Sequence, residues 1–402
     1  MNRVLFDDFE RSDCSPGTYT ESRFVILNRA GGWYWARVRN LMEDWFSRLC
    51  PESQAHALQR IRSGDDRQFQ AGFWEMYCHE SLRRLGYDIT CEPDIAGSPR
   101  HPDFLATDSA GNSVVLEATV ASESNAETAS ERRKAEVFDV INQLSTSDFF
   151  LNLDVHSVGP TSPPAVRLRD QLEKWLAALD ADSVQAAIES DGLTFGPSVP
   201  RHVWNEAGWH VVFRPLPVAP QFRGQSKHRP IGMHGPGSAY VLDNSSPLQK
   251  AIKDKAGAYG QLGLPYIVAV ATDSTSPDDF DVTNALFGHE QFVWTPTASG
   301  VPDVRTTRAP DGIWFGPQGM QNRRVSALLI TKLLRPWCVG SVVPTLWHHP
   351  AAKHPLQIDG VPWRTAAVDS SGGLVYTEPS LDMSTFFELP PEWPGPEEAF
   401  AA

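Results

Sequence analysis

The sequence contains no apolar run long enough to cross a membrane as a helix. Its longest apolar stretches, Tyr266 to Ala271 and Val325 to Ile330, have the length of strands, whereas a spanning helix needs about 18 consecutive apolar residues or more. Acids occupy positions 7 and 8, where a signal peptide would have its apolar segment. We therefore expect a cytoplasmic protein without a membrane partner.

Cysteine is also scarce. The chain has five cysteines, an odd number, and none of them form a CxxC pair; they are Cys14, Cys50, Cys78, Cys91 and Cys338. A disulfide framework normally uses an even number of cysteines, and a zinc site usually contains closely spaced pairs. The pattern therefore favours reduced thiols in packed positions over disulfides or a zinc site.

Several catalytic motifs are absent. There is no G-x-S-x-G, so a serine hydrolase of the nucleophile-elbow type is not supported. The glycines of 232–237 are not followed by Lys-Ser or Lys-Thr, as those of a phosphate-binding loop would be. His79-Glu80 does not continue into H-E-x-x-H, because Arg83 stands in place of the second histidine. Any catalytic chemistry must therefore come from other residue patterns.

The charge of the chain is acidic overall but unevenly distributed. With 402 residues, 41% of them hydrophobic, the chain is long and apolar enough for two or three globular domains. Its net charge of -14 argues against coating nucleic acid by bulk electrostatics. Two windows nevertheless contain no acid: 207–242 has Arg214, Arg223, Lys227 and Arg229, and 312–358 has Arg323, Arg324, Lys332, Arg335 and Lys353. Such windows predict either a basic groove or buried strands and loops with little surface.

Helical and extended periodicities alternate along the chain. They predict helices over 35–49, 53–61, 67–85, 129–144, 166–179, 183–189 and 247–260. They predict strands over 87–91, 101–107, 113–121, 149–155, 209–213, 265–272, 312–315 and 324–334. This alternation indicates an α/β fold with a mixed sheet flanked by helices. We expect a helical N-terminal cap (1–65), an α/β core (66–275) with a basic loop insertion (215–237), a β-rich C-terminal extension (276–389) and a flexible tail (390–402).

A hairpin in this core is predicted to bring two acids together. The turn at 108–112 centres the strand pairing on Ala110, which places Asp103 opposite Glu117. Opposed Cβ atoms lie roughly 5 Å apart, and two carboxylates at that spacing repel each other unless a cation lies between them. Mg²⁺ suits such a pair, because it takes carboxylate oxygens together with water. The alternative is that both are ordinary exposed acids, or that the register is shifted by one residue.

The helix before the hairpin carries two further acids. Glu75 and Glu80 lie among aromatic and leucine residues rather than in a solvated stretch. Either could add a third carboxylate to the pair.

The order of these elements resembles that of the PD-(D/E)xK nuclease superfamily. The resemblance is carried by Phe73-Trp74-Glu75 on a helix, Pro102-Asp103-Phe104 at a strand and Leu116-Glu117-Ala118-Thr119 on the next strand. It covers 68–155, with 255–270 completing the core. It implies a restriction endonuclease-like core with Glu75, Asp103 and Glu117 as the acids of the active site.

The resemblance also implies the ligands of a metal ion. Asp103, Glu117 and the carbonyl of Ala118 would hold Mg²⁺ or Mn²⁺, and Glu75 would ligate it directly or through water. Bound metal of this kind lowers the pKa of water and neutralises charge on a scissile phosphate. The implied reaction is hydrolysis of a phosphodiester bond.

One residue departs from the family pattern. Thr119 stands where the family usually has a lysine, whose charge helps to stabilise the phosphate. A lysine from elsewhere would have to replace it, and the candidates are Lys134, Lys250, Lys253 and Lys255. We favour Lys255, because it lies on a helix that leads into the apolar strand 265–272, and such helices pack across the sheet near the site.

These features give two hypotheses of function. The first is a metal-dependent nuclease that acts on nucleic acid, with DNA favoured over RNA as the substrate, and the resemblance associates it with restriction or phage defence. Its loop at 221–229 would contact the nucleic-acid backbone through Arg223, Lys227 and Arg229, although this segment also fits a plain surface loop. The second is a catalytically inactive binding or assembly module in which Thr119 records the loss of activity. A protein partner or a homo-oligomer is compatible with both.

Overall fold

The chain folds into two compact units. The computed structural model describes residues 3–95, 98–122, 125–224, 229–236, 244–260, 262–273, 277–295 and 303–395. One unit, here the sheet unit, spans 1–15, 22–123 and 243–401, and the other, here the inserted unit, spans 16–21 and 124–242. The sheet unit is therefore interrupted twice: briefly at 16–21, and by the longer segment 124–242, which lies between the hairpin that carries the predicted acids and the helix that carries Lys255.

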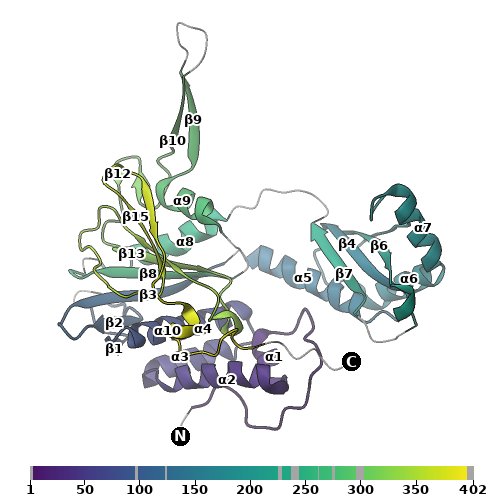
Figure 1. Ribbon diagram of the computed structural model, residues 1–402, viewed down its shortest axis with the longest axis horizontal. Coiled ribbons are helices and arrows are strands. Elements are labelled where there is room, and N and C mark those ends of the chain that lie inside the picture. Colours follow the sequence, from purple (N-terminus) through teal and green to yellow (C-terminus); the bar gives the residue numbers. More distant parts are fainter. Residues whose placement is uncertain are drawn as a thin grey trace. The chain divides into compact units, whose positions relative to one another are not determined.

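The sheet unit is built on a mixed eight-stranded sheet (Figure 1). Its strands, in spatial order, are β1 (Asp88–Cys91), β2 (Phe104–Thr107), β3 (Ser113–Ala121), β8 (Tyr266–Thr272), β13 (Ala327–Lys332), β14 (Thr345–His348), β15 (Arg364–Val368) and β16 (Leu374–Thr377). Strand β8 is parallel to both β3 and β13. Its seven residues are all buried, as expected for a central strand covered on both faces. The predicted α/β fold with a mixed sheet is confirmed.

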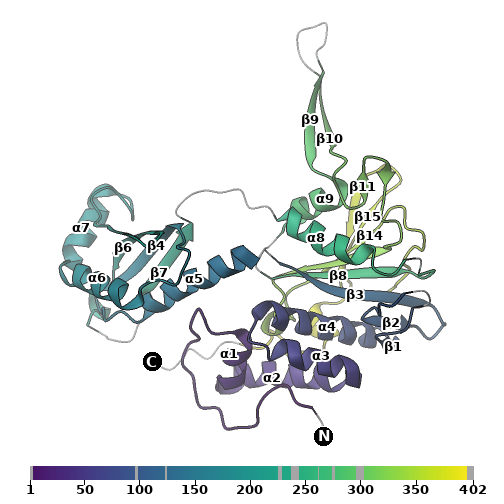
Figure 2. The same ribbon diagram turned by 180° about the vertical axis from the view of Figure 1, so that it is seen from behind.

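Helices cover both faces of this sheet, as Figure 2 shows from behind. One face carries α1 (Arg23–Arg29), α2 (Gly32–Ser47), α3 (Pro51–Ile61) and α4 (Asp66–Arg84), and the other carries α8 (Ser245–Ala256) and α9 (Asp279–Phe287). Alternation along β3 divides its side chains between two cores: Leu116 packs with the α2–α4 side and Val115 with the α8–α9 side. Glu117 therefore shares the face of Val115.

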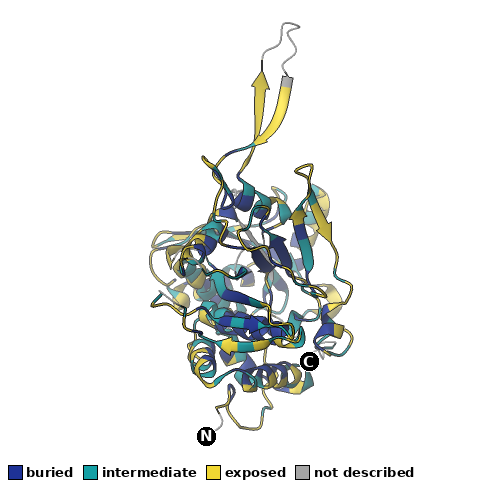
Figure 3. Cartoon of the chain, turned by 90° about the vertical axis from the view of Figure 1, so that its left-hand side faces the viewer, coloured by how far each residue is buried: buried dark blue, intermediate teal, exposed yellow. Residues whose placement is uncertain are grey.

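A thin hairpin projects from the sheet unit. It consists of β9 (Glu290–Thr295) and β10 (Asp303–Arg308), which pair antiparallel, and all six residues of β9 are exposed. Figure 3 shows this hairpin exposed, whereas the central strands below it are buried. Two further short strands, β11 (Phe315–Gly316) and β12 (Gly319–Met320), pair with each other nearby in the chain. The predicted strand at 312–315 is thus reduced to the first of these.

The C-terminal region does not form the separate extension that we predicted for 276–389. Strands β13 to β16 continue the same sheet as β3 and β8. The described end of the predicted tail is also packed, since the indole nitrogen of Trp393 donates to the Pro336 carbonyl at 3.0 Å. The short helices η2 (Pro336–Cys338) and α10 (Met383–Phe386) lie in this region. The error arises because local periodicity identifies a strand but not the strand with which it pairs.

The inserted unit has a sheet and a core of its own. Its strands, in spatial order, are β5 (His202–Glu206), β6 (Trp209–Pro217), β4 (Phe149–Ser157) and β7 (Ile231–Pro236), and its helices are α5 (Asn125–Asn142), α6 (Ala165–Ala177), α7 (Ala181–Asp191) and η1 (Pro220–Phe222). The helix predicted at 129–144 and the strand at 149–155 exist, but they belong here and not to the nuclease-like core. The predicted basic loop at 215–237 is also corrected, because β7 pairs with β4 and completes the sheet.

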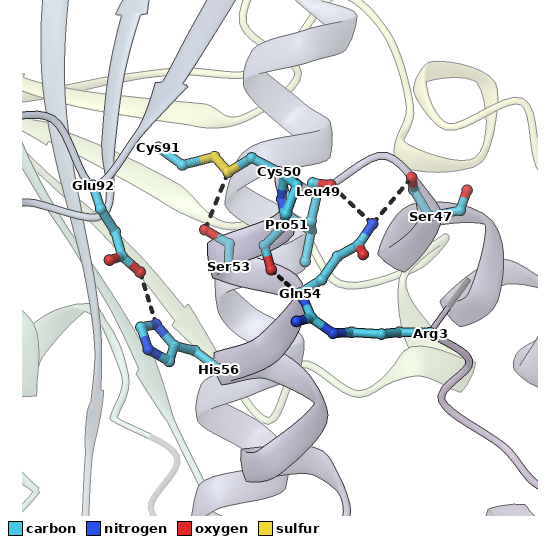
Figure 4. The surroundings of a disulfide bond; sticks show 10 residues. All are labelled: Arg3, Ser47, Leu49, Cys50, Pro51, Ser53, Gln54, His56, Cys91 and Glu92. Atoms are coloured by element: carbon cyan, nitrogen blue, oxygen red, sulfur yellow. Dashed lines mark hydrogen bonds and ion pairs between the residues drawn. A yellow bond between two sulfur atoms is a disulfide. The ribbon is translucent and has the colours of Figure 1, made fainter. Parts of the chain in front are cut away.

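The cysteine prediction is wrong for one pair. Cys50 and Cys91 form a disulfide between the residue before α3 and the last residue of β1, with their Cα atoms 6.5 Å apart (Figure 4). The two lie 41 positions apart in the sequence, so their proximity depends on the tertiary fold and no spacing rule reveals it. Cys14, Cys78 and Cys338 are free.

No helix in the described part of the chain has both the length and the apolar composition needed to cross a membrane.

Candidate active site

The hairpin has the predicted register. Strands β2 and β3 pair antiparallel from Phe104 with Leu116 to Thr107 with Ser113. Asp103 precedes the first of these pairs, and its backbone N–H donates to Oε2 of Glu117 at 3.3 Å. In turn, the backbone N–H of Ala118 donates to Oδ2 of Asp103 at 2.6 Å. The two acids therefore meet at the open end of the hairpin, as the sequence predicted.

Glu117 makes its other contacts on the α8 side of the sheet. The Lys255 ammonium forms an ion pair with Oε1 of Glu117. The hydroxyl of Tyr259 donates to Oε2 at 2.5 Å and lies 3.1 Å from the carbonyl oxygen of His101. Burial, followed by the hydrogen bond to Glu117, raises the pKa of Tyr259, so that it stays a neutral donor. Glu117 itself is only 3% exposed.

Lys255, the residue predicted from the sequence to replace the missing lysine, thus lies at one of the two acids. Alternation along β3 puts Thr119 on the same face as Glu117, and Thr119 pairs in register with Val270 of β8. The helix α8 leads into β8 and crosses that face, which brings Lys255 to Glu117. The ammonium thus reaches the acids from a helix rather than from β3.

Two of the three other lysine candidates make different contacts. Lys134 belongs to the inserted unit and pairs with Glu131 at 2.6 Å. Lys250 and Lys253 are exposed on α8, and the Lys253 ammonium lies 3.5 Å from Oε1 of Gln249.

Glu75 approaches from the opposite face on α4. This helix begins after Asp65, whose side chain accepts hydrogen bonds from the first turn, and it is buried along most of its length. The Glu75 carboxylate is 4% exposed and pairs with Arg60 of α3. Burial raises the pKa of Glu75, and the Arg60 charge opposes that effect. Glu75 therefore contributes charge to the site while its direct partner is an arginine.

Asp103 is the least compensated of the three acids. Burial raises its pKa well above the ordinary value, and the negative charges of Glu117 and Glu75 raise it further. The Ala118 N–H and the Lys255 charge oppose this effect without cancelling it. Among the hydrogen bonds of the described chain, none uses Oδ1 of Asp103. The site thus has negative charge that its own cations do not neutralise.

This donor set fits a hard divalent cation. Within the described residues, no three His, Cys, Asp or Glu side chains are grouped so as to hold a metal ion, and the direct partner of Glu75 is Arg60. Mg²⁺, however, is commonly held by one or two carboxylates, with water and substrate oxygens filling its other positions. Asp103 and Glu117, with the Ala118 carbonyl beside them, meet that smaller requirement.

Two of the three residues predicted to contact nucleic acid, Arg223 and Arg229, already have partners within the inserted unit. Arg223 pairs with Asp182 at 2.8 Å and donates to the Val218 carbonyl at 2.9 Å. Arg229 donates to the carbonyl of Gly17. Lys227 lies outside the described residues.

Sequence reasoning missed two residues of this site. Arg60 was not considered, and nothing in the sequence connects it with Glu75, because their contact depends on how α3 packs against α4. Tyr259 offered a weak signal, since it follows Lys255 by about one turn in the helix predicted at 247–260, where such residues share a face, although α8 itself ends at Ala256. Searches with the whole chain found no matching family model, no similar curated protein and no similar solved structure.

Proposed function

We propose that the chain is a metal-dependent nuclease with a restriction endonuclease-like core, acting on DNA in preference to RNA. The observation that carries the proposal is the pairing of Asp103 with Glu117 at the end of the β2–β3 hairpin, with the Lys255 ammonium on the second acid. Two carboxylates and one cation, brought from three elements to one point, match the chemical needs of phosphodiester hydrolysis.

Each side chain has a role that follows from its contacts. Asp103 and Glu117, with the Ala118 carbonyl, would hold Mg²⁺ or Mn²⁺. When bound, such a metal supplies Lewis acidity that activates water and neutralises phosphate charge. Lys255 would stabilise the negative charge that develops on the phosphate, which is the work of the family's lysine.

Tyr259 and Glu75 act through other residues. Tyr259 donates to Glu117 and holds that carboxylate in one orientation. Glu75 adds negative potential at Asp103, which favours a bound cation there. Its own partner, Arg60, keeps the buried Glu75 carboxylate from standing unpaired. Both are therefore positioning residues.

The test of this proposal is cleavage of labelled oligonucleotides by the intact chain. Single-stranded DNA, duplex DNA and RNA are each incubated with Mg²⁺, with Mn²⁺, with Ca²⁺ or with EDTA. We expect cleavage in Mg²⁺ or Mn²⁺, faster for DNA than for RNA, and none in EDTA. Equal cleavage in EDTA, or none of any substrate in any metal, would overturn the proposal.

A second candidate function is supported by a different observation. Both oxygens of Glu117 already have protein partners, namely Lys255 and Tyr259. A chain that had lost catalysis could keep such an arrangement as a structural ion pair in a binding or assembly module. That function predicts nucleic-acid binding without cleavage, and no effect of divalent metal on stability.

A further inference from the structure

The sheet unit contains a pocket whose charged lining residues come from the C-terminal acid-free window, 312–358. It has a volume of about 580 Å³ and is lined by Gly260, Leu262, Gly263, Leu264, Met320, Gln321, Asn322, Arg323, Arg324, Lys353 and His354. None of these described lining residues is an acid, and three of them carry permanent positive charge. The pocket is therefore a cationic depression on a chain whose net charge is -14.

The cations of the pocket are held in place but not neutralised. Among the described residues, no carboxylate forms an ion pair with Arg323, Arg324 or Lys353. Arg323 donates from Nε to the Ala351 carbonyl at 2.7 Å, and its own carbonyl accepts from the Lys353 N–H at 2.7 Å. These bonds join two loops, so that the charges lie on one rim. By contrast, Arg364, elsewhere in the same sheet, is paired with Asp279.

The pocket adjoins the carboxylate site. Gly260, which lines it, directly follows Tyr259, whose hydroxyl donates to Glu117. Arg324 donates to the Gly260 carbonyl at 3.4 Å. Tyr259 and Gly260 both lie in the turn between α8 and β8. A strand of nucleic acid at the carboxylates would thus have a cationic pocket within reach.

The pocket wall also leaves backbone accessible. Gly260 and Gly263 have φ of +66° and +69°, a conformation that favours glycine. No heavy atom lies within 4 Å of a Cβ placed on either one. A ligand can therefore approach the main chain closely here, as phosphate groups do in many glycine-containing loops.

We propose that this pocket binds the sugar–phosphate backbone of the nucleic acid next to the bond that is cleaved. The assignment deepens the proposed nuclease function and rests on it. Arginine and lysine side chains that have no carboxylate partner are available to bind phosphate. Arginine offers a pair of donors to the phosphate oxygens, and both side chains displace the counterions condensed on the nucleic acid. The pocket, and not the arginines of the inserted unit, supplies the electrostatic contact with the substrate.

The test compares two variants that each remove two positive charges. Arg324→Gln with Lys353→Gln removes charge from the pocket, and the control, Lys253→Gln with Lys332→Gln, removes charge from exposed lysines outside it. Binding of a labelled DNA duplex is measured in EDTA by fluorescence anisotropy over a series of salt concentrations. The slope of log K against log salt is negative, and each lost phosphate contact reduces its magnitude by about 0.9. We expect a decrease between about 1 and 2 for the pocket variant and less than half of that for the control.

The outcomes separate this proposal from the nuclease proposal. A slope unchanged from the wild type, a decrease equal to that of the control, or no binding by the wild type at low salt would overturn the pocket assignment. Cleavage in Mg²⁺ with no change in slope rejects the pocket alone, whereas a changed slope without any cleavage supports the pocket and rejects the nuclease. If the double variant unfolds, Lys353→Gln alone replaces it, with Lys332→Gln as its control.

Discussion

Two buried acid sites in the sheet unit differ in how their charge is compensated. Glu80, on α4, is fully buried and pairs with Arg83 at 2.8 Å, Arg84 at 2.7 Å and Arg48 at 3.3 Å. Burial would raise its pKa, but the hydrogen bonds from Arg83 and Arg84, together with the charges of Arg48 and Arg83, outweigh that effect and lower the pKa. At the hairpin, burial and neighbouring carboxylates raise the pKa of Asp103. One site has surplus positive charge and the other has surplus negative charge.

This difference separates a structural acid from a candidate functional one. A carboxylate that is surrounded by arginines stabilises the fold and has no need of a further cation. A carboxylate that is buried beside other carboxylates costs stability unless something positive arrives, and such groups cluster at functional sites. In the sequence, Glu75 and Glu80 looked equally suited to a third carboxylate. In the structure, Glu80 forms ion pairs with arginines, whereas the charge of Glu75 acts on Asp103.

The largest expected effect is the loss of cleavage when the hairpin acids are neutralised. Asp103→Asn and Glu117→Gln each remove a negative charge that would hold the metal, and metal ions contribute several kcal/mol to such reactions. We expect each variant to cleave at least about a hundredfold more slowly in Mg²⁺. Rates are measured under single-turnover conditions with the preferred oligonucleotide.

Glu80→Gln is the matched control for these two variants. It removes one buried carboxylate from the same unit, but from the site that its arginines already neutralise. Its cleavage rate should equal that of the wild type at a temperature where both are folded. If Glu80→Gln lost as much activity as Asp103→Asn, the distinction between the two acid sites would fail.

The next largest effect concerns Lys255. Lys255→Met keeps the aliphatic stem and removes the charge. Because a preorganised charge at the phosphate acts mainly in the transition state, we expect the cleavage rate to fall roughly tenfold to hundredfold. Metal binding should persist, which is checked by the rise in melting temperature on adding Mg²⁺. Cleavage at the wild-type rate would show that Lys255 serves only as a partner of Glu117.

Neutralising Glu80 should lower the stability of the fold, although it should leave the cleavage rate unchanged. Glu80→Gln leaves Arg83 and Arg84 around a neutral amide, and removing one partner of a buried ion pair typically costs about 3–5 kcal/mol. Since Arg83 is partly exposed, we expect a loss of roughly 2–3 kcal/mol in the free energy of unfolding. Urea denaturation of the wild type and the variant measures it. An unchanged denaturation midpoint would contradict the structural role of Glu80.

The smallest expected effect is a pH dependence that differs between the sites. A raised pKa means that the folded chain holds the Asp103 proton more tightly than the unfolded chain does. Its contribution to stability therefore falls as pH rises from the ordinary value of 3.8 through the folded value. For Glu80, whose pKa is lowered, the stabilisation is present above 4.5 and is lost as pH falls through the folded value.

Melting temperatures in EDTA between about pH 4 and pH 8 test these signs. Asp103→Asn should melt above the wild type, and the gap should widen as pH rises, because only the wild type then carries the extra charge. Glu80→Gln should melt below the wild type, and its deficit should shrink toward acid pH. A gap for Asp103→Asn that narrows with rising pH would mean that the Asp103 charge stabilises the fold.

The sequence predicted the hairpin well because its signals are local. The predicted strand at 113–121 has the bounds of β3, and the pairing centred on Ala110 is the observed one. Alternation and turn chemistry set both features, and neither depends on distant parts of the chain. The choice of Lys255 followed from one topological rule, that a helix leading into a central strand packs across the sheet.

The features that were missed are all long-range. Strand β4 has the same apolar pattern whichever sheet it joins, so its place in the inserted unit could not be read from 149–155. The Cys50–Cys91 disulfide and the Arg60–Glu75 ion pair depend on the packing of separate elements. The basic windows had similar charge in sequence, yet Arg214 and Arg223 of the first form ion pairs with acids, whereas Arg323, Arg324 and Lys353 of the second line a pocket without acids.

We propose that the surplus negative charge at Asp103 and Glu117 holds a divalent cation. Isothermal titration calorimetry of Mg²⁺ or Mn²⁺ into the metal-free chain measures this binding without relying on catalysis. We predict a single binding event for the wild type and for Glu80→Gln, and none for Asp103→Asn. Binding of equal strength to Asp103→Asn, or no binding to the wild type, would contradict the claim.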